Sequence, residues 1–389
     1  METIPFFDCY FWLNQITIIS NFMRNRFFIL MAAGLPLFTT ACQKSSQGDT
    51  ILTTQGTVVK YFQNPLLNGD HADPFVAQKN GNYYFLSTKG NRVAIAKTTA
   101  MSQLAAATET TVWTPPENTD HSADLWAPEL HFLAGKWYIY VAAAQKGVDD
   151  SNRMFVLEND NADPTQGTWN FKGKIADPAN DQWAIDGSVV TVSNKNYFVW
   201  SGWENPTEKY KQYIYLAPML NPWTISGPRI KISSPTNDWE KWEPAFLGAG
   251  VNEAPVMLQR DANSPLFIIF SASRYSSDHY CLAQIQLKTG SDPALAENWI
   301  NKKQVFVKSD KNAVYGPGHN GFFTSSHTDK NGTVKTENWF IYHARNMPND
   351  PGQARTTRMQ QLSWKADGSP DFGTANSTGI NLPCPINEQ

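Results

Sequence analysis

The stretch HADPFVAQKNGNYYFLST, residues 71–88, sets a turn-like motif, a short apolar run, a small loop and an aromatic strand in one order. Proline cannot donate a backbone hydrogen bond to a sheet, so Asp73, which precedes Pro74, is expected in the first residues of a strand or in the turn before it. The alternation in YYFLS and the Asn-Gly break before it are typical of a hairpin. One such stretch is compatible with an ordinary turn aspartate, and only the rest of the chain can decide whether a carboxylate is needed there.

The same plan occurs five times along the chain. The four later copies are LWAPELHFLAGKWYIYVAA (125–143), AIDGSVVTVSNKNYFVWSG (184–202), NEAPVMLQRDANSPLFIIFSAS (252–273) and PGHNGFFTSSHTDKNGTVKTENWFIYHAR (317–345). A third strand-like run follows each copy: RVAIAKT, RMFVLEN, QYIYLAP, HYCLAQI and TTRMQQL. The first four copies continue into a fourth run: TVWTP, WNFKGKI, PRIKIS and the region of QVFVK.

These repeats predict an all-β fold, a five-bladed β-propeller with about four antiparallel strands per blade, formed by residues 60–389. A β-sandwich is the alternative, but it does not explain five repeats with the motif in the same position. A ring of blades leaves no exposed sheet edge once it closes. We expect KYF (60–62) or INLP (380–383) to supply the strand that closes it.

In a propeller, the first strand of each blade lines the central channel, so the motifs deliver their polar residues to one end of it. Those residues are Asp73, Glu129, Asp186, Glu253 and His319. Two chemistries fit such a ring: binding of Ca²⁺, which takes oxygen ligands, and glycoside hydrolysis, which needs one protonated acid and one ionised base. A third carboxylate would raise the pKa of the acid. Blades on opposite sides of a narrow channel could set acid and base ~6.5–9.5 Å apart, as an inverting enzyme needs.

The composition excludes some classes of function. The chain has 389 residues, a formal net charge of -3 and a sequence pI of 6.2, so it has no basic excess to bind nucleic acid. Aromatic residues make up 13% and include 14 tryptophans. We expect most of these in the core and a minority in loops, where a flat ring can stack on a sugar.

The N-terminal region has the character of an export signal. MRNRFFILMAAGLPLFTTAC, from Met23 to Cys42, orders two arginines, an apolar run and small residues as a secretory signal does. Residues 1–42 are therefore interpreted as an upstream extension plus a signal or lipoprotein-type segment, and 43–59 as a polar tether. Cys42 is then a lipidated first residue, in the periplasm or on the outer membrane, or the protein is plainly secreted. Cys281 is expected as a buried free thiol, and whether it pairs with Cys384 stays open.

HADPFV, LWAPEL, AIDGSV, NEAPV and GPGHNGFF, in this order, resemble the blade motifs of glycoside hydrolase family 43 over about residues 60–375. The resemblance implies a five-bladed propeller and an inverting mechanism. It implies that Asp73 is the general base, that Glu253 is the general acid, and that Asp186 raises the pKa of the acid and holds it in place. His319 matches a family histidine that binds a calcium ion or its water shell, and no organic cofactor is implied.

One position departs from the family pattern, which has Glu-Gly-Pro at the acid where this chain has Glu253-Ala254-Pro255. The added methyl is tolerable at negative φ, whereas a positive φ would require the loop to shift.

Other residues are assigned more weakly. Trp126 is a candidate to stack on a sugar, with a core position as the alternative. Arg358 resembles a family arginine that reaches the substrate, and His71 could form a hydrogen bond near the base. Four residues are expected to be structural: Glu129, His131, His279 and His343.

The texture of LWAPELHFLAGKWYIYVAAA, NPWTISGPRIKIS and WAIDGSV most resembles exo-acting α-L-arabinofuranosidases, which release terminal sugars from arabinan or arabinoxylan. A β-xylosidase or an endo-arabinanase of the same family is the alternative. Two rivals of other classes are a non-catalytic glycan-binding surface propeller and a calcium-stabilised platform for protein binding. The expected partner is a plant cell-wall oligo- or polysaccharide. We expect a monomer that does not bind nucleic acid and that meets a membrane only through a lipid on Cys42.

Overall fold

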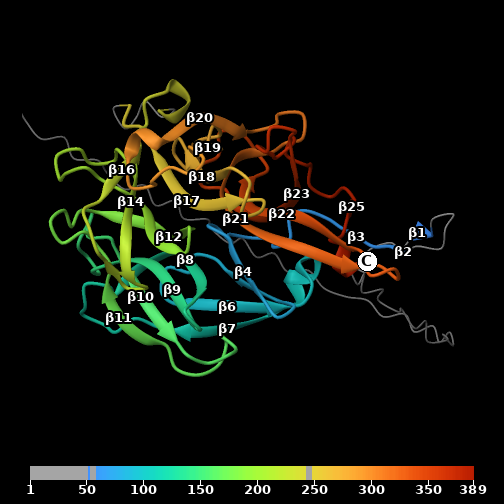
Figure 1. Ribbon diagram of the computed structural model, residues 1–389, viewed down its shortest axis with the longest axis horizontal. Helices are drawn as coiled ribbons and strands as arrows, with labels where there is room; N and C mark the ends of the chain where they lie inside the picture. The colour runs from blue at the N-terminus through green and yellow to red at the C-terminus, as the bar shows by residue number, and fades with distance from the viewer. Residues whose placement is uncertain (1–50, 53–57, 242–247) are drawn as a thin grey trace, which may run out of the picture. The chain divides into compact units, whose positions relative to one another are not determined.

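The structure is a computed structural model that describes residues 51–52, 58–241 and 248–389. The predicted export segment, residues 1–42, lies outside the described residues, as does most of the predicted tether. Five antiparallel sheets follow one another along the chain, and each contains the four strands of one blade (Figure 1). The predicted five-bladed β-propeller is therefore confirmed. Among the described residues, no helix has the length and apolar character needed to cross a membrane.

Each blade runs in chain order from an inner strand to an outer one. The first blade has β4 (Phe75–Lys79), β5 (Asn82–Leu86), β6 (Val93–Thr98) and β7 (Thr108–Trp113). The second has β8 (Ala123–Leu133), β9 (Lys136–Ala144), β10 (Arg153–Asn159) and β11 (Asn170–Lys174). The third has β12 (Ala184–Val192), β13 (Lys195–Gly202), β14 (Tyr213–Asn221) and β16 (Ile230–Ser233), with β15 (Thr224–Ile225) beside β14.

The last two blades repeat this order. The fourth has β17 (Asn252–Gln259), β18 (Leu266–Ala272), β19 (Cys281–Leu287) and β20 (Trp299–Phe306). The fifth has β21 (Tyr315–Thr328), β22 (Val334–Arg345), β23 (Thr356–Trp364) and a short β24 (Pro370–Asp371). Outside the blades, the described residues also form β1 (Ile51–Leu52), β2 (Val58–Val59), and the 3-10 turns η1 (Met101–Ala106), η2 (Asp238–Glu240), η4 (Ala296–Asn298) and η5 (Ile386–Glu388).

The ring closes differently from the prediction. β3 (Tyr61–Phe62) and β25 (Leu382–Pro383) pair with each other in a separate two-stranded sheet, so neither adds a strand to a blade (Figure 1). Closure comes from packing, because the inner strands β21 and β4 contact each other. An apolar cluster there joins Val76 of the first blade to Ile341 of the last.

The core lies between the faces of neighbouring blades. Aromatic side chains on the second strands fill these spaces, as where the rings of Tyr84 and Trp137 meet edge to face at 5.3 Å. Strands buried on both faces read as near-continuous apolar runs, such as WYIYVAAA in β9. Cys281 and Cys384 are both buried and free, so the two thiols do not pair.

Candidate active site

A cavity of about 640 Å³ opens at the end of the channel where the inner strands begin. Its lining includes Asp73 from the first blade, Asp186 from the third, Glu253 from the fourth and His319 from the fifth. All four residues are at least nine-tenths buried. The structure thus brings together four of the five residues that the repeated motif placed at the channel end.

The backbone turns sharply where each inner strand begins. In every blade a non-glycine residue has a left-handed backbone there: Asp73, Ala127, Asp186, Ala254 and His319, with φ between 44° and 58°. The second blade has another at Asp124, with φ 52°. Such backbones are uncommon outside glycine, and they cluster at functional sites. In β12, β17 and β21 they coincide with register shifts against the second strand, which re-aim the side chains.

The five polar residues of the repeated motif therefore do not occupy equivalent backbone positions. Asp73, Asp186 and His319 occupy the left-handed position itself, whereas Glu253 precedes it by one residue. Glu129 follows it by two residues, does not line the cavity, and is buried against His131, whose Nε2 lies 2.8 Å from Oε2 of Glu129. The expected structural role of Glu129 agrees with this position.

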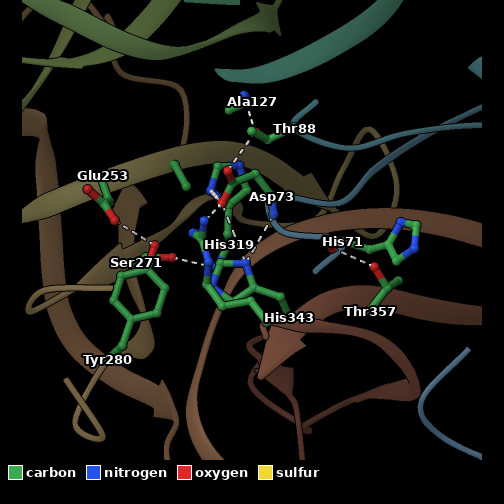
Figure 2. A network of polar contacts seen from close by, with 12 residues as sticks. His71, Asp73, Thr88, Ala127, Glu253, Ser271, Tyr280, His319, His343 and Thr357 are labelled. Carbon is green, nitrogen blue, oxygen red and sulfur yellow. Dashed lines mark hydrogen bonds and ion pairs between the residues drawn. The ribbon is translucent and has the colours of Figure 1, made fainter. Parts of the chain in front are cut away.

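Asp73 is held at both carboxylate oxygens (Figure 2). Its Oδ1 accepts a hydrogen bond from Nη1 of Arg355 at 3.1 Å, and its Oδ2 accepts one from the Thr88 hydroxyl at 2.7 Å. Oγ1 of Thr88 in turn accepts the backbone N–H of Ala127 at 2.8 Å. The left-handed residue of the second blade thereby fixes the hydroxyl that orients the carboxylate of the first.

Two histidines complete the surroundings of Asp73. Nδ1 of His319 lies 3.3 Å from its Oδ1, and the backbone N–H of Asp73 donates to Nδ1 of His343 at 3.1 Å. Burial alone would raise the pKa of Asp73. The Arg355 charge, the two histidines and the Thr88 hydrogen bond outweigh it and hold that pKa well below its usual range.

Glu253 has the opposite environment. Burial first, and then repulsion from Asp73, raise the pKa of Glu253 to about 7, although the hydroxyl of Tyr280 donates to Oε1 at 2.7 Å. Asp186 is buried too, and its Oδ2 accepts the backbone N–H of Ala254 at 3.0 Å. Burial and the charge of Glu253 raise the pKa of Asp186 well above its usual range. Since two like charges so placed repel each other, the pair keeps a proton near neutral pH while Asp73 is ionised.

The sequence profile of Glycosyl hydrolases family 43 matches residues 62–370, which contain every residue of this site. The chain belongs to this family. The resemblance stated from the five motifs is therefore confirmed.

Named relatives and a solved structure agree with it. An "Extracellular exo-alpha-(1->5)-L-arabinofuranosidase" of Streptomyces avermitilis is 36% identical over 330 residues, which cover 82% of this chain and 64% of that protein. "Alpha-L-arabinofuranosidase 43" of Humicola insolens is 32% identical, over 93% of this chain and 70% of its own. The crystal structure of an α-L-arabinofuranosidase from Lactobacillus brevis is similar with a TM-score of 0.71 at 31% identity, covering 82% of this chain and 98% of that one. The chain thus spans less than two thirds of the length of the Streptomyces relative.

Two predicted substrate-binding residues do not reach the cavity of this family 43 propeller. Arg358 is fully buried, and its guanidinium donates to Oγ1 of Thr356 and to the backbone carbonyl of Arg345. The arginines that line the cavity are Arg274 and, three residues before Arg358, Arg355. Positions three apart in an extended strand face opposite sides, which explains the difference.

His71 is the second predicted substrate-binding residue that does not line the cavity. Its backbone carbonyl accepts a hydrogen bond from the Thr357 hydroxyl at 2.7 Å, and its ring lies apart from the Asp73 cluster (Figure 2). His71 and Asp73 would face the same side of a regular strand. The left-handed backbone of Asp73 breaks this alternation, so the two side chains point in different directions. Trp126, in contrast, does line the cavity, and its part in binding sugar stays a prediction.

Sequence reasoning missed several residues of the site. Four of them line the cavity, namely Thr88, Gln212, Tyr275 and Arg355. Tyr280 does not line it but donates a hydrogen bond to Glu253. His343, which was expected to be structural, contacts the backbone of Asp73. Tyr275 precedes β19 by six residues. The other missed residues lie near the C-terminal end of a second strand or near the start of a third strand, and these positions are at the channel end of each blade.

Proposed function

We propose that this protein is an α-L-arabinofuranosidase that releases terminal arabinofuranosyl residues with inversion. The observation that carries the proposal is the contrast between two buried carboxylates in one cavity. Asp73 has a lowered pKa and Glu253 a pKa of about 7, so one is a base and the other an acid at the same pH. A glycan-binding propeller or a structural platform needs no such pair.

Each carboxylate has one task. Asp73 takes a proton from water as the water oxygen bonds to the anomeric carbon. On the other face of the sugar, Glu253 gives its proton to the glycosidic oxygen as the bond between this oxygen and the anomeric carbon breaks. In this proposal the proton that the coupled pair keeps is on Glu253, Asp186 is the carboxylate that opposes its loss, and Oδ2 of Asp186 holds the adjacent backbone. Exchange of protons with water then restores both groups.

The choice of sugar rests on the relatives, whose names specify α-L-arabinofuranose and, for the Streptomyces protein, an exo action on 1,5-linked units. The proposed substrate is an arabinan or arabinoxylan-type polysaccharide of plant cell walls. A β-xylosidase or an endo-arabinanase of the family is the second candidate. Relatives named extracellular support export, either by plain secretion or as a lipoprotein through Cys42.

The calcium ion expected at His319 is also a proposal. Among the residues that the structure describes, no three His, Cys, Asp or Glu side chains gather as a metal site. An ion held by His319 would therefore take most of its ligands from water, as Ca²⁺ can. It would supply positive charge near the base. Activity before and after chelation, with Ca²⁺ added back, tests this.

The function is tested by hydrolysis of p-nitrophenyl α-L-arabinofuranoside beside the β-xyloside. The wild type, Asp73→Asn and Glu253→Gln are assayed together, and each substitution should cost ~10²–10⁴-fold. The anomer released first, read by proton NMR, reports inversion. Preference for the xyloside would change the sugar and keep the mechanism. No turnover of either glycoside or of linear arabinan would sink the proposal in favour of a glycan-binding propeller.

A further inference from the structure

Behind the acid lies a tyrosine that the mechanism above does not use. Tyr280 stands just before β19, is fully buried and does not line the cavity. Its hydroxyl donates to Oε1 of Glu253 at 2.7 Å. A buried hydroxyl aimed at the catalytic acid from the protein side affects the reaction only through that acid.

The direction of this hydrogen bond is fixed by a chain of three residues (Figure 2). The backbone N–H of His319 donates to Oγ of Ser271 at 2.8 Å, so the hydroxyl proton of Ser271 is free for another acceptor. The Ser271 side chain lowers the pKa of Tyr280 as a hydrogen-bonding neighbour, so we infer that its hydroxyl points at that of Tyr280. Tyr280 then has its own proton left, and it donates this to Glu253. A backbone N–H cannot reverse its role, so the whole chain has one direction.

The ring of Tyr280 is fixed as firmly as its hydroxyl. It stacks on the imidazole of His343, with ring centroids 5.6 Å apart and planes inclined by 9°. On another side it meets Gly318, where a Cβ would lie 2.2 Å from the ring. Glycine is therefore required in the PGHNG motif because Tyr280 occupies the space of a side chain.

We propose that Tyr280 is a positioning residue for the general acid, because it reserves Oε1 of Glu253 as an acceptor and so keeps the acidic proton on Oε2. This inference rests on the proposed function. When the leaving oxygen departs, the proton moves from Oε2 to it, and the carboxylate that remains is stabilised by the hydrogen bond to Oε1. Without the hydroxyl, the proton can occupy either oxygen and the carboxyl group can rotate.

The consequence depends on the leaving group. Departure of a poor leaving group such as phenol needs a well-placed proton, whereas 2,4-dinitrophenolate leaves without one. Tyr280→Phe keeps the stack on His343 and the packing on Gly318, and removes only the hydroxyl. We expect kcat/KM to fall on the order of ten- to hundredfold on phenyl α-L-arabinofuranoside, and by less than about threefold on the 2,4-dinitrophenyl substrate.

Two more variants and a matched control accompany it. Ser271→Ala removes the hydroxyl that directs Tyr280, and should show the same dependence on the leaving group in a weaker form. Glu253→Gln sets the limit for complete loss of the acid. Tyr138→Phe is the control, because the Tyr138 hydroxyl donates to Oε2 of Glu158 at 2.8 Å outside the site, and its removal should change neither rate.

The pH profile gives a second readout. The charged or titratable groups that face Glu253 are Asp73, Asp186, Arg355 and Tyr280. The hydrogen bond stabilises the ionised form of Glu253, so its loss should move the basic limb of the profile to higher pH. An equal loss on both substrates with an unmoved basic limb would mean a structural role and overturn the inference, as would wild-type rates in Tyr280→Phe. A wild type inactive on both arabinofuranosides would overturn the proposed function itself.

Discussion

Oδ2 of Asp186 accepts the backbone N–H of Ala254, the residue directly after Glu253, at 3.0 Å. The hydrogen bond joins the third blade to the fourth at the place where the chain departs from the family pattern. It keeps the carboxyl group of Asp186 beside the acid and fixes the strand that carries the acid. Ala254 has φ 51° and is fully buried, so an alanine adopts the left-handed backbone for which the family uses glycine.

Ala254→Gly should therefore be tolerated. Glycine adopts φ 51° without the strain of a Cβ, while the loss of a buried methyl and the greater freedom of the unfolded chain oppose this gain. We expect the melting temperature to change little and activity to stay within about threefold of wild type. Ala254→Val should lose both stability and activity, because a β-branched residue at this backbone is a genuine outlier. Thermal unfolding and arabinofuranoside hydrolysis of the pair check this, and an inactive glycine variant would contradict it.

Substitution of two arginines near the fifth blade, the partly exposed Arg355 and the buried Arg358, should have different effects. Arg355 donates to Asp73, so Arg355→Met should raise the pKa of the base, shift the acidic limb of the rate profile to higher pH and lower kcat/KM on the order of 10²-fold. Arg358→Met should lower the melting temperature and leave kcat/KM within about threefold of wild type, because Arg358 does not reach the cavity. Equal kinetic losses in the two variants would contradict this assignment.

The difference between these arginines shows what the sequence could and could not predict. The repeated motif located Asp73, Asp186, Glu253 and His319, because a hairpin pattern fixes where each inner strand begins. Residues of the second and third strands carry no such mark. Thr88 and Arg355 reach the same channel end only because antiparallel strands bring the end of one beside the start of the next.

The closing of the ring failed as a prediction for a related reason. KYF and INLP read as strands, and they are strands, but their partner is each other. Which strands pair over a separation of some 320 residues depends on tertiary packing, and strand propensity does not encode it.

The charge of Asp186 should be visible in the pH dependence of the reaction. Activity is lost as pH rises through the pKa of Glu253, because the acid must be protonated. Asp186→Asn removes a negative charge beside Glu253, so this pKa should fall and the basic limb should move to lower pH. The rate at the optimum should also drop, because an amide can turn its NH₂ group toward the N–H of Ala254. An unmoved basic limb, measured on a substrate with a poor leaving group, would argue that Asp186 only holds the backbone.

The acid should also cost the protein stability at high pH. The pKa of Glu253 is raised from 4.5 to about 7, so between these values the folded state binds more protons than the unfolded state. Stability contributed by this proton is present in full below 4.5 and is lost as pH rises toward and through 7. Glu253→Gln removes the effect, so its free energy of unfolding should exceed that of the wild type by a margin that grows from pH 5 to pH 8. That margin should approach on the order of 3 kcal/mol. Urea unfolding of both proteins at the two pH values measures it, and Glu158→Gln, outside the site, is the control. A difference that does not change with pH would mean that burial and Asp73 do not hold the proton on Glu253.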